Sequence, residues 1–323
     1  MNRISLAGLS CLALILAACG GSDKADSKDK ITVPKDPFPS TYAPYPNPSV
    51  FIANATIIDG TGALIEKGGL LIENGKVSAI GKDLTAPGDA KVIDAAGRWV
   101  TPGIVDNHSH LGVYPSPSVS AHGDGNEISG PVTAEVWSEH GIWPQDPGFT
   151  RALAGGVTAL QVLPGSANLF GGRGVTLKNV PSRTVQGMKF PGAPYTLKMA
   201  CGENPKRVYG YGSGSYPGGS PYSRMGNVAG YRESWIRAAD YKRKWEKYEK
   251  EGGDAPMRDL ELDTLKGVLD GDILVHMHCY RADEMAQVMD ISKEFGYKVT
   301  AFHHAVEAYK IADKLAEYGA CSS

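Results

Sequence analysis

Strand-like and helix-like segments alternate from Pro102 onward, and this alternation restricts the fold more than any other feature. Short apolar runs predict strands at 104–108, 157–163, 175–180, 195–200, 273–278 and 299–303. Helical patterns are predicted at 223–251, 282–295 and 306–318. Strands that alternate with helices form parallel sheets joined by crossover helices, so the sequence predicts an α/β fold.

The number of strand–helix units is about six, whereas a closed (β/α)8 barrel has eight strands and typically about 250 residues. Residues 102 to 323 number only 222. We therefore expect an incomplete TIM-type barrel whose C-terminal strands are missing. An open, doubly wound six-stranded sheet is the alternative that composition leaves open.

A smaller β region precedes the barrel, at residues 50–101. Its stretches VFIANATIIDGTG, GGLLIENGKVSAIG and AKVIDAAGRWVTPG alternate apolar runs with turn residues. Asn74-Gly75, between two such runs, is the sequence of a two-residue hairpin turn. About 50 residues are too few for a confident independent core. We predict part of a small β-sandwich that packs on the barrel.

The first 18 residues are typical of an export signal. Arg3 precedes an apolar run at 4–18, which is shorter than the roughly 20 residues of a membrane span. Leu16-Ala17-Ala18-Cys19 resembles a bacterial lipobox, in which the cysteine is lipidated. We therefore expect an exported protein, anchored through Cys19 on the periplasmic side of a membrane. A plain secretory peptide is the alternative.

Residues 19–49 are polar and rich in proline, with little apolar surface to offset the entropy of ordering. We predict a disordered tether between the anchor and the folded region. Once the leader is removed and Cys19 is lipidated, three cysteines remain: Cys201, Cys279 and Cys321. An odd number implies no complete disulfide framework. The formal net charge of −2 gives no support for nucleic acid as a partner.

The histidines all lie after Pro102, and six of the eight form three close groups at the carboxyl ends of predicted strands. These groups are His108 with His110, His276 with His278, and His303 with His304. The carboxyl ends of barrel strands carry the active site, and residues two apart on a strand share a face. Imidazole suits zinc and related divalent ions. One HxH pair is weak evidence, but three groups are hard to explain by packing alone.

Two local choices accompany this pattern. In a regular strand only one of His303 and His304 faces the barrel interior, and spacing does not choose between them. Lys198 alternates with Leu197 and Met199, so it points inward if those two face the helices. An inward lysine needs a functional role or an ion-pair partner. A lysine that extends into solvent at the strand end is the alternative.

These motifs resemble the amidohydrolase superfamily. The stretch 101–111, TPGIVDNHSHL, is similar to that family's first barrel strand, whose pattern is PG-[LIV]-[LIV]-D-x-H-x-H. ILVHMH at 273–278 resembles its fifth strand, and FHHAVEAY at 302–309 resembles its sixth. TLKMACGEN at 196–204 is similar to the lysine strand of imidazolonepropionase-like and prolidase-like members. The resemblance extends from about residue 50 to the end of the chain.

The resemblance implies one or two divalent ions, most consistent with zinc. It implies that four histidines bind the ions in two pairs, His108 with His110 and His276 with His304. Lys198, carboxylated by CO2, would join the two ions, and His278 would contact the substrate. Glu203 is the alternative bridging carboxylate. The family also places an aspartate after its eighth strand, and this sequence contains no counterpart.

The implied chemistry is hydrolysis of an amide-type C–N bond in a small molecule or short peptide, such as a dipeptide or a cyclic amide. A divalent ion lowers the pKa of bound water toward about 7, so hydroxide forms at neutral pH. Arg173 and Arg207 are candidate contacts for an acidic group of the substrate, with surface positions as the alternative. A non-catalytic lipoprotein that binds a metal or solute is the second functional hypothesis.

Overall fold

The computed structural model describes residues 31–211 and 220–323. The predicted signal peptide, the lipidation site Cys19 and the tether up to residue 30 lie outside the described residues. No helix among the described residues is both long and apolar enough to cross a membrane.

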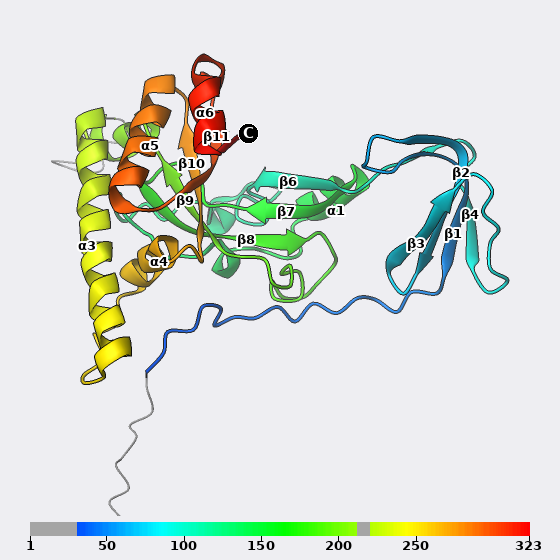
Figure 1. The fold of residues 1–323 in the computed structure, drawn as a ribbon, viewed down its shortest axis with the longest axis horizontal. Coiled ribbons are helices and arrows are strands. Elements are labelled where there is room, and N and C mark those ends of the chain that lie inside the picture. Colours follow the sequence, from blue (N-terminus) through cyan, green and yellow to red (C-terminus); the bar gives the residue numbers. More distant parts are fainter. Residues whose placement is uncertain (1–30, 212–219) are drawn as a thin grey trace, which may run out of the picture. The chain divides into compact units, whose positions relative to one another are not determined.

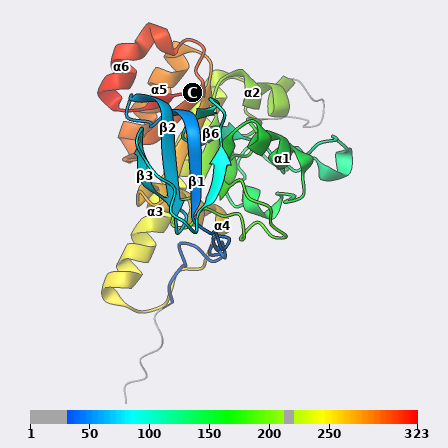
Figure 2. The same cartoon turned by 90° about the vertical axis from the view of Figure 1, so that its right-hand side faces the viewer.

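The N-terminal β region forms a sheet of its own. Its strands are β1 (Val50–Ile58), β2 (Leu64–Glu73), β3 (Lys76–Gly81), β4 (Lys91–Asp94) and β5 (Trp99–Val100). The order is β3-β2-β1-β4, with β5 paired to β1, and Figure 2 shows the first three strands side by side. Asn74 and Gly75 connect β2 to β3 with φ of +52° and +74°, as a primed hairpin turn requires. The predicted hairpin is therefore confirmed.

The α/β region contains a seven-stranded sheet (Figure 1). Its strands are β6 (Ile104–Ser109), β7 (Val157–Val162), β8 (Phe170–Lys178), β9 (Thr196–Ala200), β10 (Leu274–Cys279), β11 (Val299–His304) and β12 (Cys321–Ser322). They follow one another in chain order across the sheet, and all neighbours are parallel except those of β8. The described residues thus form an incomplete TIM-type barrel with a small N-terminal β domain, as expected.

Strand β8 differs from the prediction. We expected a parallel barrel strand at 175–180, but the strand spans Phe170–Lys178 and is antiparallel to both β7 and β9. Only seven residues, 163–169, separate it from β7. A parallel connection needs a dozen residues or more, so this short link forces a hairpin.

The helices follow the predicted pattern closely. They are α1 (Pro147–Ala154), α2 (Glu203–Pro205), α3 (Arg224–Glu251), α4 (Leu260–Leu269), α5 (Ala282–Phe295) and α6 (Ala312–Tyr318). Helix α3 begins where the side chain of Ser223 accepts a hydrogen bond from Gly226 N, and α5 ends at Gly296 in the left-handed region. Buried residues of α3, α4 and α5 share one apolar core with β9 and β10. This core fixes the strands that carry the candidate site.

Residues 33–49 do not behave as a free tether. Within them, the segment 35–45, which we call the N-terminal strap, contacts the barrel region at several points. Ser40 Oγ donates to the carbonyl of Lys189 at 2.7 Å, and Thr41 N donates to the carbonyl of Gln186 at 3.0 Å. Tyr45 Oη lies 3.1 Å from the Pro181 carbonyl. The composition predicted disorder because it shows no large apolar residues, whereas these contacts are mainly polar.

Candidate metal centre

Lys198 lies at the centre of the candidate site. Leu197 and Met199 join the apolar core, so the alternation of β9 turns Lys198 to the other face. Its side chain is completely buried and has no acidic partner. Nζ donates to Ser166 Oγ at 2.8 Å and to the Pro164 carbonyl at 3.2 Å. Burial lowers the pKa of Lys198 to about 7, so a large share of the amine is neutral at physiological pH.

Histidines from three separate strands meet beside this lysine. Strand register pairs His276 of β10 with Lys198 of β9. His303 of β11 is fully buried, and its Nε2 lies 2.8 Å from Nδ1 of His276. Its Nδ1 lies 2.8 Å from Nδ1 of His108, which comes from β6 at the other end of the sheet. The predicted convergence of distant imidazoles is therefore present.

His304 departs from the expected alternation. Only one of the adjacent pair was expected to face the interior, yet the His304 ring lies 4.8 Å from the His108 ring and 4.6 Å from the His278 ring, between centroids. His304 has a φ of +65°, which is outside the extended region. This backbone turn brings the His304 ring to the same cluster as the buried His303. The structure therefore places both imidazoles at the candidate site.

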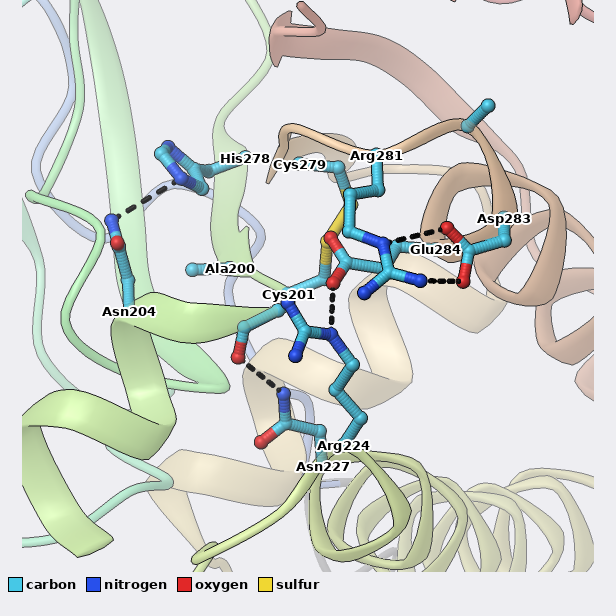
Figure 3. The surroundings of a disulfide bond; sticks show 12 residues. Ala200, Cys201, Asn204, Arg224, Asn227, His278, Cys279, Arg281, Asp283 and Glu284 are labelled. Atoms are coloured by element: carbon cyan, nitrogen blue, oxygen red, sulfur yellow. Dashed lines mark hydrogen bonds and ion pairs between the residues drawn. A yellow bond between two sulfur atoms is a disulfide. The ribbon is translucent and has the colours of Figure 1, made fainter. Parts of the chain in front are cut away.

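The remaining histidines have well-defined partners or a clear lack of them. His110 Nδ1 donates to the Leu163 carbonyl at 2.8 Å, which leaves its Nε2 as the nitrogen that faces His108 at 3.2 Å. His278 Nε2 lies 3.2 Å from Asn204 Nδ2 (Figure 3). His278 Nδ1 is buried without a hydrogen-bond partner among the described residues. An orphaned, buried ring nitrogen is unusual unless another group completes the site.

The electrostatics favour neutral imidazoles. Burial, followed by the positive charge of Lys198, lowers the pKa of His108 to about 3, of His276 to about 4 and of His278 to about 3. Burial and the neighbouring His276 and His108 lower the pKa of His303 to about 2. Neutral imidazole is the form that binds metal ions. The cluster is therefore in its ligand state across the physiological range.

The donor set fits a divalent ion, although the side chains contact one another. Among residues 31–211 and 220–323, no three histidine, cysteine or acidic side chains are arranged to hold a single ion. The ring nitrogens instead lie 2.8–3.2 Å apart, at hydrogen-bond distance. Neutral imidazoles, an orphaned nitrogen on His278 and a buried neutral lysine are the chemistry that zinc and similar ions require.

Three other predicted site residues lie elsewhere. Arg173 is buried on β8, where it pairs in register with Leu197 and therefore faces away from Lys198. Its guanidinium carbon lies 4.0 Å above the Trp137 ring, so the structure does not support a contact with substrate. Glu203 and Arg207 are exposed on the helical turns that follow β9. The buried position of Lys198 makes it a better bridging candidate than Glu203.

A disulfide that the sequence did not predict joins the two strands of the site. Cys201 follows β9 and Cys279 ends β10, and their Cα atoms are 5.2 Å apart (Figure 3). Cys201 N also donates to the His278 carbonyl at 2.8 Å. Cys321 is free and exposed. The available signal was positional, because each bonded cysteine lies just beyond a histidine or lysine at the end of adjacent strands.

The lowered histidine pKa values predict acid sensitivity of the metal-free protein. An unfolded histidine titrates near 6.5, whereas His108, His276 and His278 titrate at about 3 to 4 when folded. The unfolded state therefore binds more protons in this window, and stability falls as pH drops from 6.5 toward 4. Each extra proton adds about 1.36 kcal/mol per pH unit to the slope.

Urea unfolding of chelator-treated protein at a series of pH values measures this slope. The His278→Asn variant is expected to flatten it, whereas His122→Asn, at an exposed position outside the cluster, is not. A free energy of unfolding that is constant from pH 7 to pH 4 would contradict the assignment.

Comparison with known proteins gives a consistent result. No protein-family profile matches the chain. The amidohydrolase tasK of Hapsidospora irregularis is 35% identical over 246 residues, which are 71% of this chain and 25% of that protein. A dihydroorotase of Geotalea daltonii is 58% identical over 36 residues, 11% of this chain and 8% of that enzyme. The chain thus spans a quarter or less of the length of these curated relatives.

A solved structure gives the broadest match. The crystal structure of an amidohydrolase from Thermotoga maritima MSB8 is 38% identical, with a TM-score of 0.78. The match covers 84% of this chain and 69% of that one. The likeness extends over the strands that carry the histidines and Lys198, and it agrees with the resemblance of the sequence motifs. The chain belongs to the amidohydrolase superfamily.

Proposed function

We propose that the protein is a metal-dependent hydrolase that cleaves amide-type C–N bonds in a small molecule or a short peptide. The observation that carries the proposal is the convergence of neutral imidazoles from β6, β10 and β11 on the buried amine of Lys198. Packing alone does not account for such a cluster, because buried polar rings need partners. Membership of the amidohydrolase superfamily supports the same reaction class.

The residues of the site divide the task between them. His108 and His110 would hold one divalent ion, and His276 with one of His303 and His304 would hold a second. A bound ion supplies activated water at neutral pH and polarises a carbonyl oxygen. Lys198 is kept largely neutral by burial, which is the form of an amine that reacts with CO2 to become a bridging carbamate.

Two further side chains would act on the substrate. His278 is neutral and has an unpartnered Nδ1, so it can hold or accept a proton at that atom. Asn204 contacts the opposite nitrogen, Nε2, and so orients the ring. We assign His278 to substrate contact and proton transfer, and Asn204 to its orientation.

We also propose that the protein is exported and lipidated at Cys19. The lipobox-like sequence at residues 16–19 supports this location. The Cys201–Cys279 disulfide supports it independently, because disulfides persist mainly in oxidising compartments. Metabolic labelling with a palmitate analogue, in the wild type and in Cys19→Ala, is expected to mark only the wild-type chain.

Metal analysis combined with an amide-hydrolysis screen tests the proposed function. The wild type is expected to bind one or two divalent ions, and chelation is expected to remove turnover that zinc then restores. His108→Asn should weaken metal binding by at least the roughly 10–100-fold that loss of a supporting partner costs. His122→Asn, outside the cluster, is the matched control and should bind metal normally.

The outcomes separate the two functional hypotheses. Metal binding without turnover of any amide would favour a non-catalytic metal- or solute-binding lipoprotein. Turnover that survives both chelation and His108→Asn would refute the metal-dependent reaction.

A further inference from the structure

A buried ammonium connects the N-terminal strap to the barrel region. Lys189 is 3% exposed and lies on the connection between β8 and β9. Its Nζ donates to Asp36 Oδ1 at 2.8 Å and to the Phe38 carbonyl at 2.7 Å. Glu139 Oε2 lies 3.2 Å away, and Tyr195 Oη is a further contact. The strap therefore supplies two of the oxygens that compensate this buried charge.

The carboxylates of two separate segments meet at this point. Tyr195 Oη lies 2.9 Å from Glu139 Oε1 and 3.0 Å from Asp36 Oδ1. The side chain of Glu139 is fully buried, whereas that of Asp36 is 40% exposed. Partial burial raises the pKa of Asp36, but hydrogen bonds from Lys189 and Tyr195 outweigh it and hold the pKa below its ordinary value. Asp36 is therefore ionised when the strap is docked.

An aromatic contact adds a second point of attachment. Phe38 meets the edge of Trp137 at 5.6 Å and of His140 at 4.8 Å, between ring centroids. Trp137 and His140 are themselves stacked at 5.5 Å. Both rings belong to the segment 136–141, which we call the η2 loop because it contains the short 3-10 helix Ser138–His140 (η2). The strap thus contacts this loop through Phe38 and, by way of Glu139, through Asp36.

The η2 loop forms one wall of a pocket beside the candidate site. Trp137 and Ser138 line a pocket of about 190 Å³, together with Pro164 and Gly171 on another wall. The carbonyl of Pro164 accepts a hydrogen bond from Lys198 Nζ. The pocket therefore borders the buried lysine, and the position of the η2 loop sets its width.

We propose that the N-terminal strap positions the η2 loop for substrate binding, with Asp36 and Phe38 as positioning residues. The inference rests on the proposed function, because the pocket would hold the substrate of that reaction. Neither residue touches the histidine cluster. Loss of the strap contacts frees the loop that carries Trp137, and the pocket wall then becomes mobile and binds substrate less tightly.

The test uses the full chain with Asp36→Asn, Phe38→Ala and the double variant. Lys35→Met is the matched control, since it removes an ion pair of the same strap, to Asp272, from a lysine side chain that is 78% exposed. Two quantities are measured: hydrogen exchange of amides 136–141, and KM and kcat for an amide found in the screen. We expect faster exchange in the double variant and a roughly tenfold higher KM, with kcat within about twofold of the wild type.

The readouts distinguish failure of this inference from failure of the proposed function. Unchanged exchange in the η2 loop of the double variant would overturn the inference, whether or not the wild type is active. Faster exchange with an unchanged KM would overturn the role in substrate binding and leave the proposed hydrolase intact. A loss of kcat together with a matching drop in Tm would show a purely structural role. If the wild type turns over no amide, faster exchange in the double variant and not in Lys35→Met supports the bracing contact.

Discussion

Replacing Lys198 with methionine is expected to remove amide hydrolysis and, at the same time, to stabilise the metal-free protein. The lysine is fully buried without an acidic partner, and its pKa is lowered to about 7. An ordinary lysine titrates at 10.5, so the folded state disfavours the proton that the unfolded chain retains. Methionine has a similar length and no charge, and it is expected to raise the free energy of unfolding by about 3 kcal/mol at pH 7.

The sign of this effect depends on pH in a defined way. Between pH 7 and pH 10.5 the unfolded chain binds a proton that folded Lys198 does not, so the wild-type free energy of unfolding rises with pH there. Lys198→Met removes this rise, and the two proteins therefore converge in stability toward pH 10.5. The loss of a bridging group should cost several kcal/mol of transition-state stabilisation, or roughly 10²–10³-fold in turnover.

Chelator-treated wild type, Lys198→Met and Lys178→Met are compared by urea unfolding at pH 7 and pH 10, and the untreated proteins by kcat. Lys178, also on β8 of the barrel sheet, lies over the rings of Tyr42 and Phe190 and serves as the control. Turnover close to wild type in Lys198→Met would contradict its place in the site. A less stable variant at pH 7 would contradict the account of its burial.

Removal of the Cys201–Cys279 disulfide is expected to give the largest loss of stability. The bond closes a loop with a sequence separation of 78, and chain entropy assigns such a loop about 4 kcal/mol. The two strands it joins carry Lys198 on one side and His276 and His278 on the other. We therefore expect the Cys201→Ala/Cys279→Ala variant to bind metal less tightly as well as to unfold at lower urea.

Cys321→Ala is the control, because that thiol is exposed and unbonded. Thermal unfolding of both variants, with and without zinc, measures the two effects. A double variant with wild-type Tm and wild-type metal affinity would show that the bond contributes nothing to strand placement. A Tm loss with unchanged metal affinity would limit its role to global stability.

Much of the fold was predictable because local signals and topology agree. Asn74-Gly75 requires positive φ at both positions, and the hairpin forms there. The period of the apolar residues predicted α5 to the residue, and the alternation of β9 placed Lys198 inward. Strand β8 was misread because apolar patterning reveals a strand but not its direction. The seven-residue link from β7 carried that information.

The site was only partly predictable, because its details depend on backbone turns and on long-range contacts. The HxH spacing placed His108 and His276 correctly, but no pattern indicates the φ of +65° that turns His304 to the cluster. Arg173 was considered a substrate contact from residue type alone, whereas its register with Leu197 directs it to Trp137. Metal identity, carboxylation of Lys198 and lipidation of Cys19 stay predictions.

The contact between His108 and His303 also has a consequence for the order of folding. These two rings come from strands near opposite ends of the sheet and are separated by 195 residues in the sequence. Neither the hairpin of the β region nor the pairing of β9 with β10 requires that distance to be closed. Contacts between remote residues form late because a long chain must first be brought together. The histidine cluster is therefore expected to assemble last, after a translocated chain has already built the walls around it.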